Sequence, residues 1–134
     1  MKVALYVRVS TGRQAQNQTI EQQLARLQTA VESHPEWQLS PTHIYRDDGY
    51  SGSTLNRPGL DRLREQAAMA AFERVIITAP DRLARKYVHQ VLLIDEFEKL
   101  GCQIEFLERP MKDDDLHDQL LLQIRGALLN MNGI

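Results

Sequence analysis

The sequence predicts an α/β protein with a single doubly wound, mainly parallel sheet and helices on both of its faces. Short apolar runs of strand type alternate along the chain with amphipathic stretches of helix type, in the order β-α-β-α-β-α-β-α. One run, Val75-Ile76-Ile77, is the uninterrupted β-branched pattern of a strand buried on both faces. With 134 residues, 43% of them hydrophobic, we expect residues 1–134 to form one domain.

The first expected strand runs from Val3 to Val9 and leads directly into Ser10. Aliphatic residues alternate along it with Ala, Tyr and Arg, so one face is aliphatic and the other ends in Arg8 beside Ser10. Open α/β sheets bind their ligands at the carboxyl ends of strands, which makes Ser10 a candidate for chemistry. An ordinary turn is the other interpretation of the same stretch.

The first helix is expected from Thr19 to about Ser33, because Thr19 and Gln22 have the spacing of a capping box. Its core-facing stripe also contains Gln23. From spacing alone, a buried amide with local partners is the favoured interpretation of Gln23, and a hydrogen bond to the end of the first strand is the alternative. The apolar members of the stripe are Ile20, Leu24, Leu27 and Val31.

A second strand is expected near residues 43–46, followed by a polar loop from Asp47 to Ser53 that contains two glycines. Pro58 then starts the second helix in its preferred first-turn position. Arg57 stands at the entrance of that helix, whose N-terminus attracts anions. An arginine there reinforces a phosphate site.

A third strand, expected over residues 74–78, is followed by Asp81-Arg82-Leu83-Ala84-Arg85-Lys86. As a purely structural feature, Asp81 would cap the third helix and pair with Arg85 four residues later. That interpretation does not explain Arg82 beside Arg85, because clustered guanidinium groups repel one another unless they share an anion.

The third helix is expected to continue to Leu100 and to end at Gly101, before a fourth strand over residues 103–107. A long C-terminal helix follows the acidic run Asp113-Asp114-Asp115 and extends toward Asn130. Its apolar stripe is wider than packing on one sheet requires, and we favour a self-association surface over deep burial. The surplus residues are Leu121, Leu122 and Leu129.

The composition limits the classes of function. A net charge of −2, with twelve Arg and four Lys, favours a local anion site over a wholly basic surface. The four His lack metal-ligand spacing, and the single Cys102 cannot form an intrachain disulfide. The sequence shows no membrane-spanning stretch and no signal peptide, so we expect a cytoplasmic protein.

Three separated segments together resemble the catalytic domain of the serine recombinases, the resolvase/invertase family, over almost the whole chain. They are Tyr6-Val7-Arg8-Val9-Ser10-Thr11, Ser51-Gly52 followed by Arg57-Pro58-Gly59-Leu60, and Asp81-Arg82-Leu83-Ala84-Arg85. The resemblance implies a site-specific DNA recombinase of a transposon or phage. Ser10 would attack a DNA phosphodiester to give a 5′-phosphoserine intermediate, followed by strand exchange and rejoining without metal, cofactor or ATP.

The resemblance also implies roles and partners. The partner would be DNA, with self-association to a dimer and a synaptic tetramer, and no membrane is implied. Arginines would bind and neutralise the phosphate, Asp81 would move protons or orient an arginine, and Gln23 would lie near the site. The implied catalytic residues are Ser10, Arg8, Arg82, Arg85, Asp81 and Gln23, and the implied contacts with the substrate phosphate are Arg57 and Ser51.

The chain departs from the family in two respects. Small resolvases have a lysine in the second helix where this chain has Gln66. Nothing in the sequence resembles a helix-turn-helix or a zinc module, so we expect the DNA-binding domain to be absent from this chain.

Two other classes of function stay open at this point. One is a non-catalytic doubly wound module, either receiver-like or nucleotide-binding, with Asp47 and Asp48 as an acidic pocket. A receiver-like module would need acidic residues after the first strand, where this chain has Arg8 and Ser10, and a nucleotide-binding one would need a glycine-rich loop. The other is a metal-dependent nuclease, whose carboxylates would have to converge.

Overall fold

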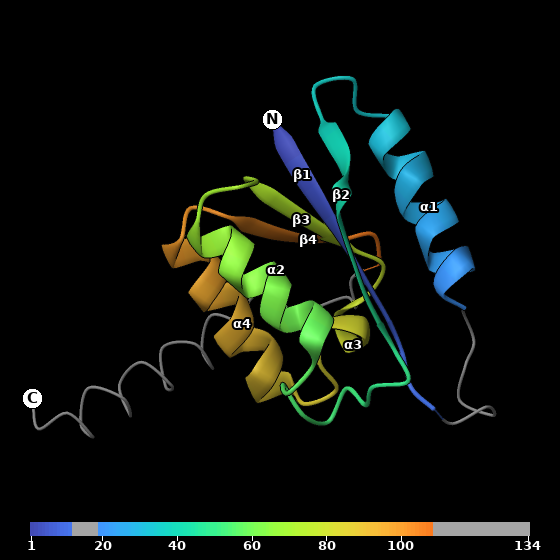
Figure 1. Cartoon of the computed structure of the whole chain (residues 1–134), viewed down its shortest axis with the longest axis vertical. Coiled ribbons are helices and arrows are strands. Elements are labelled where there is room, and N and C mark those ends of the chain that lie inside the picture. Colours follow the sequence, from blue (N-terminus) through green and yellow to red (C-terminus); the bar gives the residue numbers. More distant parts are fainter. Residues whose placement is uncertain (12–18, 109–134) are drawn as a thin grey trace, which may run out of the picture.

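The computed structural model describes residues 1–11 and 19–108. Within these ranges the strands form one sheet in the order β2-β1-β3-β4, and every neighbouring pair is parallel (Figure 1). The doubly wound, parallel α/β fold predicted from the sequence is therefore confirmed for the described part of the chain. In chain order the elements are β1 (Lys2–Val9), α1 (Ile20–Glu32), β2 (Gln38–Asp48), α2 (Pro58–Ala68), β3 (Arg74–Ile77), α3 (Pro80–Leu83), α4 (Tyr87–Lys99) and β4 (Gln103–Phe106).

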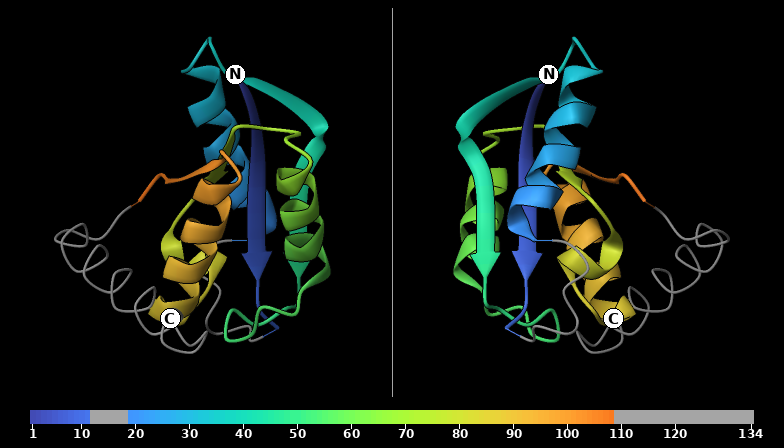
Figure 2. Two further views of the ribbon diagram at one scale, coloured as in Figure 1. Left: turned by 90° about the vertical axis from the view of Figure 1, so that its left-hand side faces the viewer. Right: turned by 90° about the vertical axis from the view of Figure 1, so that its right-hand side faces the viewer.

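The strand order places a topological switch point beside β1. The chain passes from β1 to β2 on one side, then crosses back over β1 to reach β3 and continues outward to β4. Helix α1 covers one face of the sheet, whereas α2 and α4 cover the other (Figure 2). The carboxyl ends of β1 and β3 flank the switch point, where open α/β sheets bind their ligands.

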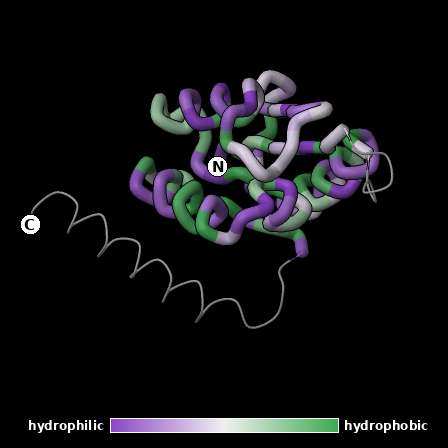
Figure 3. Tube along the Cα trace, turned by 90° about the horizontal axis from the view of Figure 1, so that it is seen from below, coloured by the Kyte–Doolittle hydropathy of each residue, from purple (hydrophilic) through white to green (hydrophobic). Residues whose placement is uncertain are grey.

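Two hydrophobic layers hold the sheet between its helices. On the α1 side, Leu24 and Leu27 pack against β1. On the opposite side, Leu60 and Leu63 of α2 and Phe97 of α4 form the second layer. Apolar residues gather along the central strands, while the helices alternate between apolar and polar turns (Figure 3). Each fully buried aliphatic or aromatic side chain contributes about 1.5–3 kcal/mol to stability.

The predicted caps of two helices are confirmed. Thr19 Oγ1 accepts from the Gln22 amide at 3.1 Å, and Gln22 Oε1 accepts from the Thr19 amide at 2.9 Å, which completes the capping box of α1. Helix α4 ends at Lys99, and Gly101, at its C′ position, has φ +78°. The Cys102 amide then donates to Phe97 O at 2.9 Å, so α4 closes with a Schellman motif.

The second strand is longer than the sequence indicated. It begins at Gln38 rather than near residue 43 and contains Pro41. Its pairing with β1 shifts from Val3↔Leu39 to Leu5↔Ile44, so residues 40–43 bulge out of the ladder. Proline is tolerated there because β2 is an edge strand and the bulge needs no amide donor.

The expected third helix is two helices, separated by an extended segment. Helix α3 ends where the Ala84 amide donates to Pro80 O, and Ala84 itself has φ −160° and ψ 145°. The next amide, of Arg85, donates to Gly52 O at 2.8 Å instead of continuing the helix. A partner from the loop after β2 thus overrides the local helical pattern. The expected C-terminal helix lies outside the described residues.

Candidate active site

The carboxyl end of β1 leads into Ser10 at the switch point. The amides of Gly49 and Tyr50 both donate to Val9 O, at 2.8 and 3.1 Å, which fixes the turn after β2 against the end of β1. Ser10 follows directly and is half-buried. The position predicted for a reactive hydroxyl is therefore the place where this sheet should bind a ligand.

The Arg8 guanidinium joins three segments of the chain. Its Nε donates to Arg82 O at 3.0 Å, one terminal nitrogen donates to Tyr50 O at 3.0 Å, and the other donates to Asp81 O at 2.6 Å. Only 3% of the residue is exposed. Because an arginine has five N–H groups, these three bonds leave capacity for further acceptors. Arg8 thus links β1 to the turn after β2 and to α3.

Gln23 of α1 lies against the same end of β1. It has no exposed surface, and its Nε2 donates to Arg8 O at 3.0 Å while its Oε1 accepts from the Arg8 amide at 3.4 Å. The amide of Gln23 therefore pairs with the backbone two residues before Ser10. Gln23 is thus a satisfied buried amide whose partners lie at the end of the first strand, and its role in the chemistry stays a prediction.

The Asp-Arg-Leu-Ala-Arg segment meets β1 at this edge. Arg82 is half-buried, and one of its terminal nitrogens lies 3.4 Å from Arg8 O, to which it donates. Arg85 and Asp81 are both exposed. The expected helix cap is wrong: Ala79 occupies the N-cap of α3 without a side-chain cap bond, and Asp81 lies within the first turn.

Arg57 is at the entrance of α2, as predicted, but it is completely buried. Its Nε donates to Thr54 O at 2.9 Å, and its NH1 donates to the Tyr6 hydroxyl at 2.9 Å. Because Arg57 has no exposed surface, its guanidinium cannot make the predicted direct contact with a substrate phosphate in this arrangement. Its guanidinium instead holds Thr54 O and the Tyr6 hydroxyl in the interior of the protein.

Tyr6 and Asp47 complete a buried polar network that sequence reasoning did not identify. The Tyr6 hydroxyl donates to Asp47 Oδ2 at 2.6 Å. The Asp47 carboxylate also accepts from the amides of Gly59 at 2.7 Å and Leu60 at 2.9 Å, and so satisfies the first turn of α2. Asp47 was considered only as part of an acidic pocket, yet its carboxylate is buried and already accepts from three donors, which argues against a receiver-like site.

The site is cationic at its centre. Burial lowers the pKa of Arg8 from its ordinary value, and the positive charges of Arg57 and Arg82 lower it further. Tyr6 and Asp81 act in the opposite direction. Guanidinium groups that repel one another at a strand end form a site that an anion would stabilise.

Ser51 lies at the rim of this group. Its hydroxyl is exposed and is 2.8 Å from the Ser53 hydroxyl. The next residue, Gly52, is buried against Arg8 and Arg85. Ser51 thus directly precedes the residue that packs against Arg8 and Arg85, and its side chain is held in a local serine turn.

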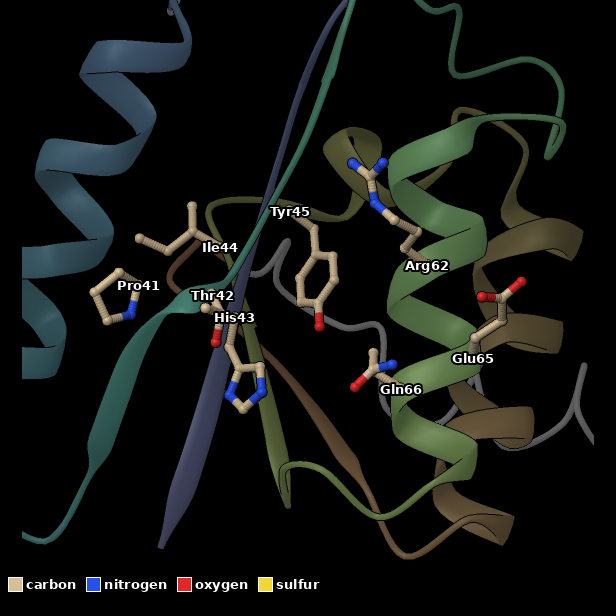
Figure 4. A pocket seen from close by; sticks show the side chains of 8 residues that line it. All are labelled: Pro41, Thr42, His43, Ile44, Tyr45, Arg62, Glu65 and Gln66. Atoms are coloured by element: carbon tan, nitrogen blue, oxygen red, sulfur yellow. The ribbon is translucent and has the colours of Figure 1, made fainter.

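A separate groove lies between β2 and α2, away from Ser10. It has a volume of about 590 Å³, and its walls are the bulged part of β2 on one side and α2 on the other (Figure 4). None of the predicted site residues lines it. Its lining residues are Pro41, Thr42, His43, Ile44, Tyr45, Arg62, Glu65 and Gln66.

Residues 1–11 and 19–108 lack two kinds of feature. No group of three or more His, Cys, Asp and Glu side chains in these ranges could hold a metal ion. No helix in the same ranges is long and apolar enough to cross a membrane.

Comparisons with known proteins agree on one family. The profile of the family described as "Resolvase, N terminal domain" matches residues 3–132. The chain is 34% identical over 127 residues to a "Putative DNA recombinase" of Bacillus subtilis strain 168, covering 94% of this chain and 24% of that protein. It is 27% identical to the "Transposon Tn3 resolvase" of Escherichia coli, covering 96% of this chain and 62% of that protein.

A solved structure shares both fold and sequence similarity. The N-terminal catalytic domain of TP901-1 integrase superposes with a TM-score of 0.74 at 29% identity, and the match covers 98% of each chain. The chain therefore has the length of that catalytic domain, whereas it spans 24% of the Bacillus relative and 62% of the Tn3 relative.

Proposed function

Because the chain belongs to the family of resolvase N-terminal domains, we propose that it is the catalytic domain of a site-specific DNA recombinase. The observation that carries the proposal is the meeting of Arg8 and Arg82 at the strand end that precedes Ser10. A hydroxyl that directly follows a strand end where two guanidinium groups meet is suited to attack a phosphodiester. The identities of the relatives and of the solved catalytic domain point the same way.

In this proposal the Ser10 oxygen attacks the phosphorus of a DNA phosphodiester. The serine hydroxyl loses its proton as a bond from its oxygen to phosphorus forms, the bond from phosphorus to the 3′ oxygen breaks, and the 3′ oxygen takes up one proton and leaves as a hydroxyl, so the step has no net gain or loss of protons. The 5′ phosphate stays on Ser10. Attack by another 3′ hydroxyl reverses the step and frees the serine, so the sequence of cleavage, strand exchange and rejoining conserves phosphodiester energy without ATP.

The arginines would neutralise the transferring phosphate. Their fixed N–H groups would supply the positive charge that phosphoryl transfer requires. Arg8 would turn its remaining N–H groups toward the phosphate, while Arg82 and Arg85 approach it from the α3 side. Asp81 would orient these arginines or move a proton, and Gln23 would hold the backbone beside Ser10. Ser51 would contact the phosphate at the rim.

Arg57 takes a different role from the one the sequence suggested. Since it is completely buried, we propose that it acts through Tyr6 and Asp47 rather than by touching the phosphate. Its charge also reaches Arg8, whose pKa it lowers. Arg57 would therefore contribute to the positive potential of the site from behind.

We also propose that the chain acts on DNA as a dimer and, at synapsis, as a tetramer, in the cytoplasm. The motive is the surplus of leucines in the segment after residue 108, represented by Leu122 and Leu129. Sedimentation of the full chain should show dimers at moderate concentration, weakened by Leu122→Glu or Leu129→Glu. A strictly monomeric chain at high concentration would contradict this part of the proposal.

The experiment that tests the chemistry traps the covalent intermediate. The full chain, fused at its C-terminus to a DNA-binding domain of known sequence, is incubated with a labelled DNA site and then digested with protease. A labelled phosphoserine peptide should map to Ser10, and Ser10→Ala should bind the DNA without cutting it. A label on Tyr6, Ser51 or Ser53 would overturn the assignment.

A further inference from the structure

Gly52 separates two of the arginines in the candidate site. A Cβ atom placed on Gly52 would lie 2.6 Å from one terminal nitrogen of Arg8 and 2.7 Å from Arg85 Cγ. Both distances are shorter than any van der Waals contact, so a side chain at this position would displace one arginine or the other. The backbone of Gly52 has no positive φ, in contrast to Gly49 and Gly101. The glycine is therefore required by space and not by backbone conformation.

The backbone around Arg85 is held from two sides. The Arg85 amide donates to Gly52 O at 2.8 Å, and the preceding carbonyl, of Ala84, accepts from Gln90 Nε2 at 2.7 Å. The peptide between Ala84 and Arg85 is thus fixed between the loop after β2 and the first turn of α4. This peptide lies in the extended break between α3 and α4, directly after the last hydrogen bond of α3, from the Ala84 amide to Pro80 O.

The same loop is held to Arg8. Tyr50 O accepts from the Arg8 guanidinium at 3.0 Å, two residues before Gly52. One face of the turn therefore contacts Arg8, and the Gly52 carbonyl holds the segment that carries Arg85. The spacing between the two guanidinium-bearing side chains depends on the thickness of this turn.

We propose that Gly52 and Gln90 are positioning residues that set the relative placement of Arg8 and Arg85 for one phosphate. The inference rests on the proposed function for its consequence in catalysis, and on the contacts of Gly52 and Gln90 for its geometry. Neither residue touches the phosphate. Since a displacement of about 1 Å costs on the order of 100-fold in rate, a methyl group at Gly52 should have an effect of that size.

Two measurements test the proposal on matched variants. Gly52→Ala adds one methyl group between the arginines, and Gln90→Glu replaces the donor to Ala84 O with an acceptor of the same shape. Gly101→Ala is the control, because it strains a positive φ in open space at the end of α4, far along the chain from the site. Gln90→Lys keeps a hydrogen-bond donor at the same position and is the conservative variant with which Gln90→Glu is compared.

The first measurement is geometric and uses the unfused chain. NMR should show the Arg85 amide and the Arg8 Nε–H protected from hydrogen exchange in the wild type and in Gly101→Ala. Gly52→Ala should alter both signals, and Gln90→Glu should expose the Arg85 amide. Unchanged protection of both groups in Gly52→Ala would overturn the positioning role, independently of any measurement of DNA cleavage.

The second measurement is the single-turnover rate of phosphoserine formation by the fused chain. Gly52→Ala should lower it about 100-fold at saturating DNA without changing the DNA concentration at half-saturation, while Gln90→Lys should recover most of the rate lost in Gln90→Glu. A Gly52→Ala rate within twofold of wild type would overturn the inference. If the wild type forms no adduct, the proposed function fails, and the exchange data still decide whether Gly52 and Gln90 position the arginines.

Discussion

The Tyr6 hydroxyl donates a 2.6 Å hydrogen bond to Asp47, which lies 41 positions further along the chain. The two residues come from the paired strands β1 and β2, and Arg57 donates to the same hydroxyl from the entrance of α2. A buried carboxylate and a buried guanidinium are thus connected through one phenol behind the candidate site. Removal of any member leaves polar groups without compensation.

Asp47→Asn should destabilise the fold by about 3 kcal/mol, the upper range for a hydrogen bond to a charged group. The carboxylate accepts from Tyr6 and from two amides of α2, and an amide side chain presents a donor where one of these acceptors is needed. Urea unfolding followed by circular dichroism measures the change. Asp48→Asn, at the exposed neighbouring position, is the control and should change stability by less than about 0.5 kcal/mol. Equal effects of the two variants would contradict the account.

Tyr6 should make the stability of the protein fall at alkaline pH. Burial raises the pKa of Tyr6 above its ordinary value of 10.0, and the Asp47 carboxylate raises it further although Arg57 opposes both. A group whose folded pKa exceeds its unfolded pKa stabilises the fold fully below the unfolded value. This contribution is therefore complete below pH 10 and is lost as the pH rises above it.

Tyr6→Phe tests this pH dependence. The variant should be less stable than wild type at pH 8, by about 1–3 kcal/mol, because Asp47 and Arg57 lose their shared partner. Between pH 10 and 11.5 its stability should fall less steeply than that of wild type, since the raised pKa of Tyr6 is absent. Unfolding midpoints measured across this range decide the matter, and parallel curves for the two proteins would count against it.

The site residues that belong to single strands or helices could be predicted from the sequence, whereas the hydrogen bonds between different elements could not. Arg8 and Gln23 lie on elements with clear strand or helix periodicity and Ser10 directly follows a strand, so their positions follow from local patterns. The Tyr6, Asp47 and Arg57 network depends on the register between β1 and β2 and on where α2 docks, and no local pattern contains either. An inward-facing tyrosine and an aspartate at a strand end were the available signals.

The break between α3 and α4 was missed for a related reason. The segment from Asp81 to Lys86 has helical composition, and only its partners Gly52 and Gln90 explain why Ala84 is extended. Both partners come from other elements. Tertiary hydrogen bonds overrode the local preference at the position that presents Arg85, which is where function makes such a conflict useful.

Arg82→Lys should slow cleavage about 100-fold even though it keeps the positive charge. The Arg82 guanidinium donates to Arg8 O and would share a phosphate through its planar fork, and a lysine ammonium cannot replace both contacts. The measurement is the single-turnover rate of phosphoserine formation by the fused chain. Arg62→Lys, exposed on α2 beside the separate groove, is the matched control and should cleave like wild type. Wild-type rates for both Arg82→Lys and Arg82→Ala would remove phosphate binding as the role of Arg82.

Residues 1–134 alone should bind DNA weakly and without sequence preference, even with every candidate active-site residue present. The chain carries a net charge of −2, so it exerts little long-range attraction on duplex DNA. The arginines of the candidate site form one local cluster, and a protein that neutralises few phosphates has low affinity and a shallow dependence on salt. Titration of a fluorescent duplex at several salt concentrations measures both quantities, and fusion to a DNA-binding domain should restore site-directed cleavage. Tight, sequence-selective binding by the unfused chain at physiological salt would reveal a DNA-reading surface outside the candidate site.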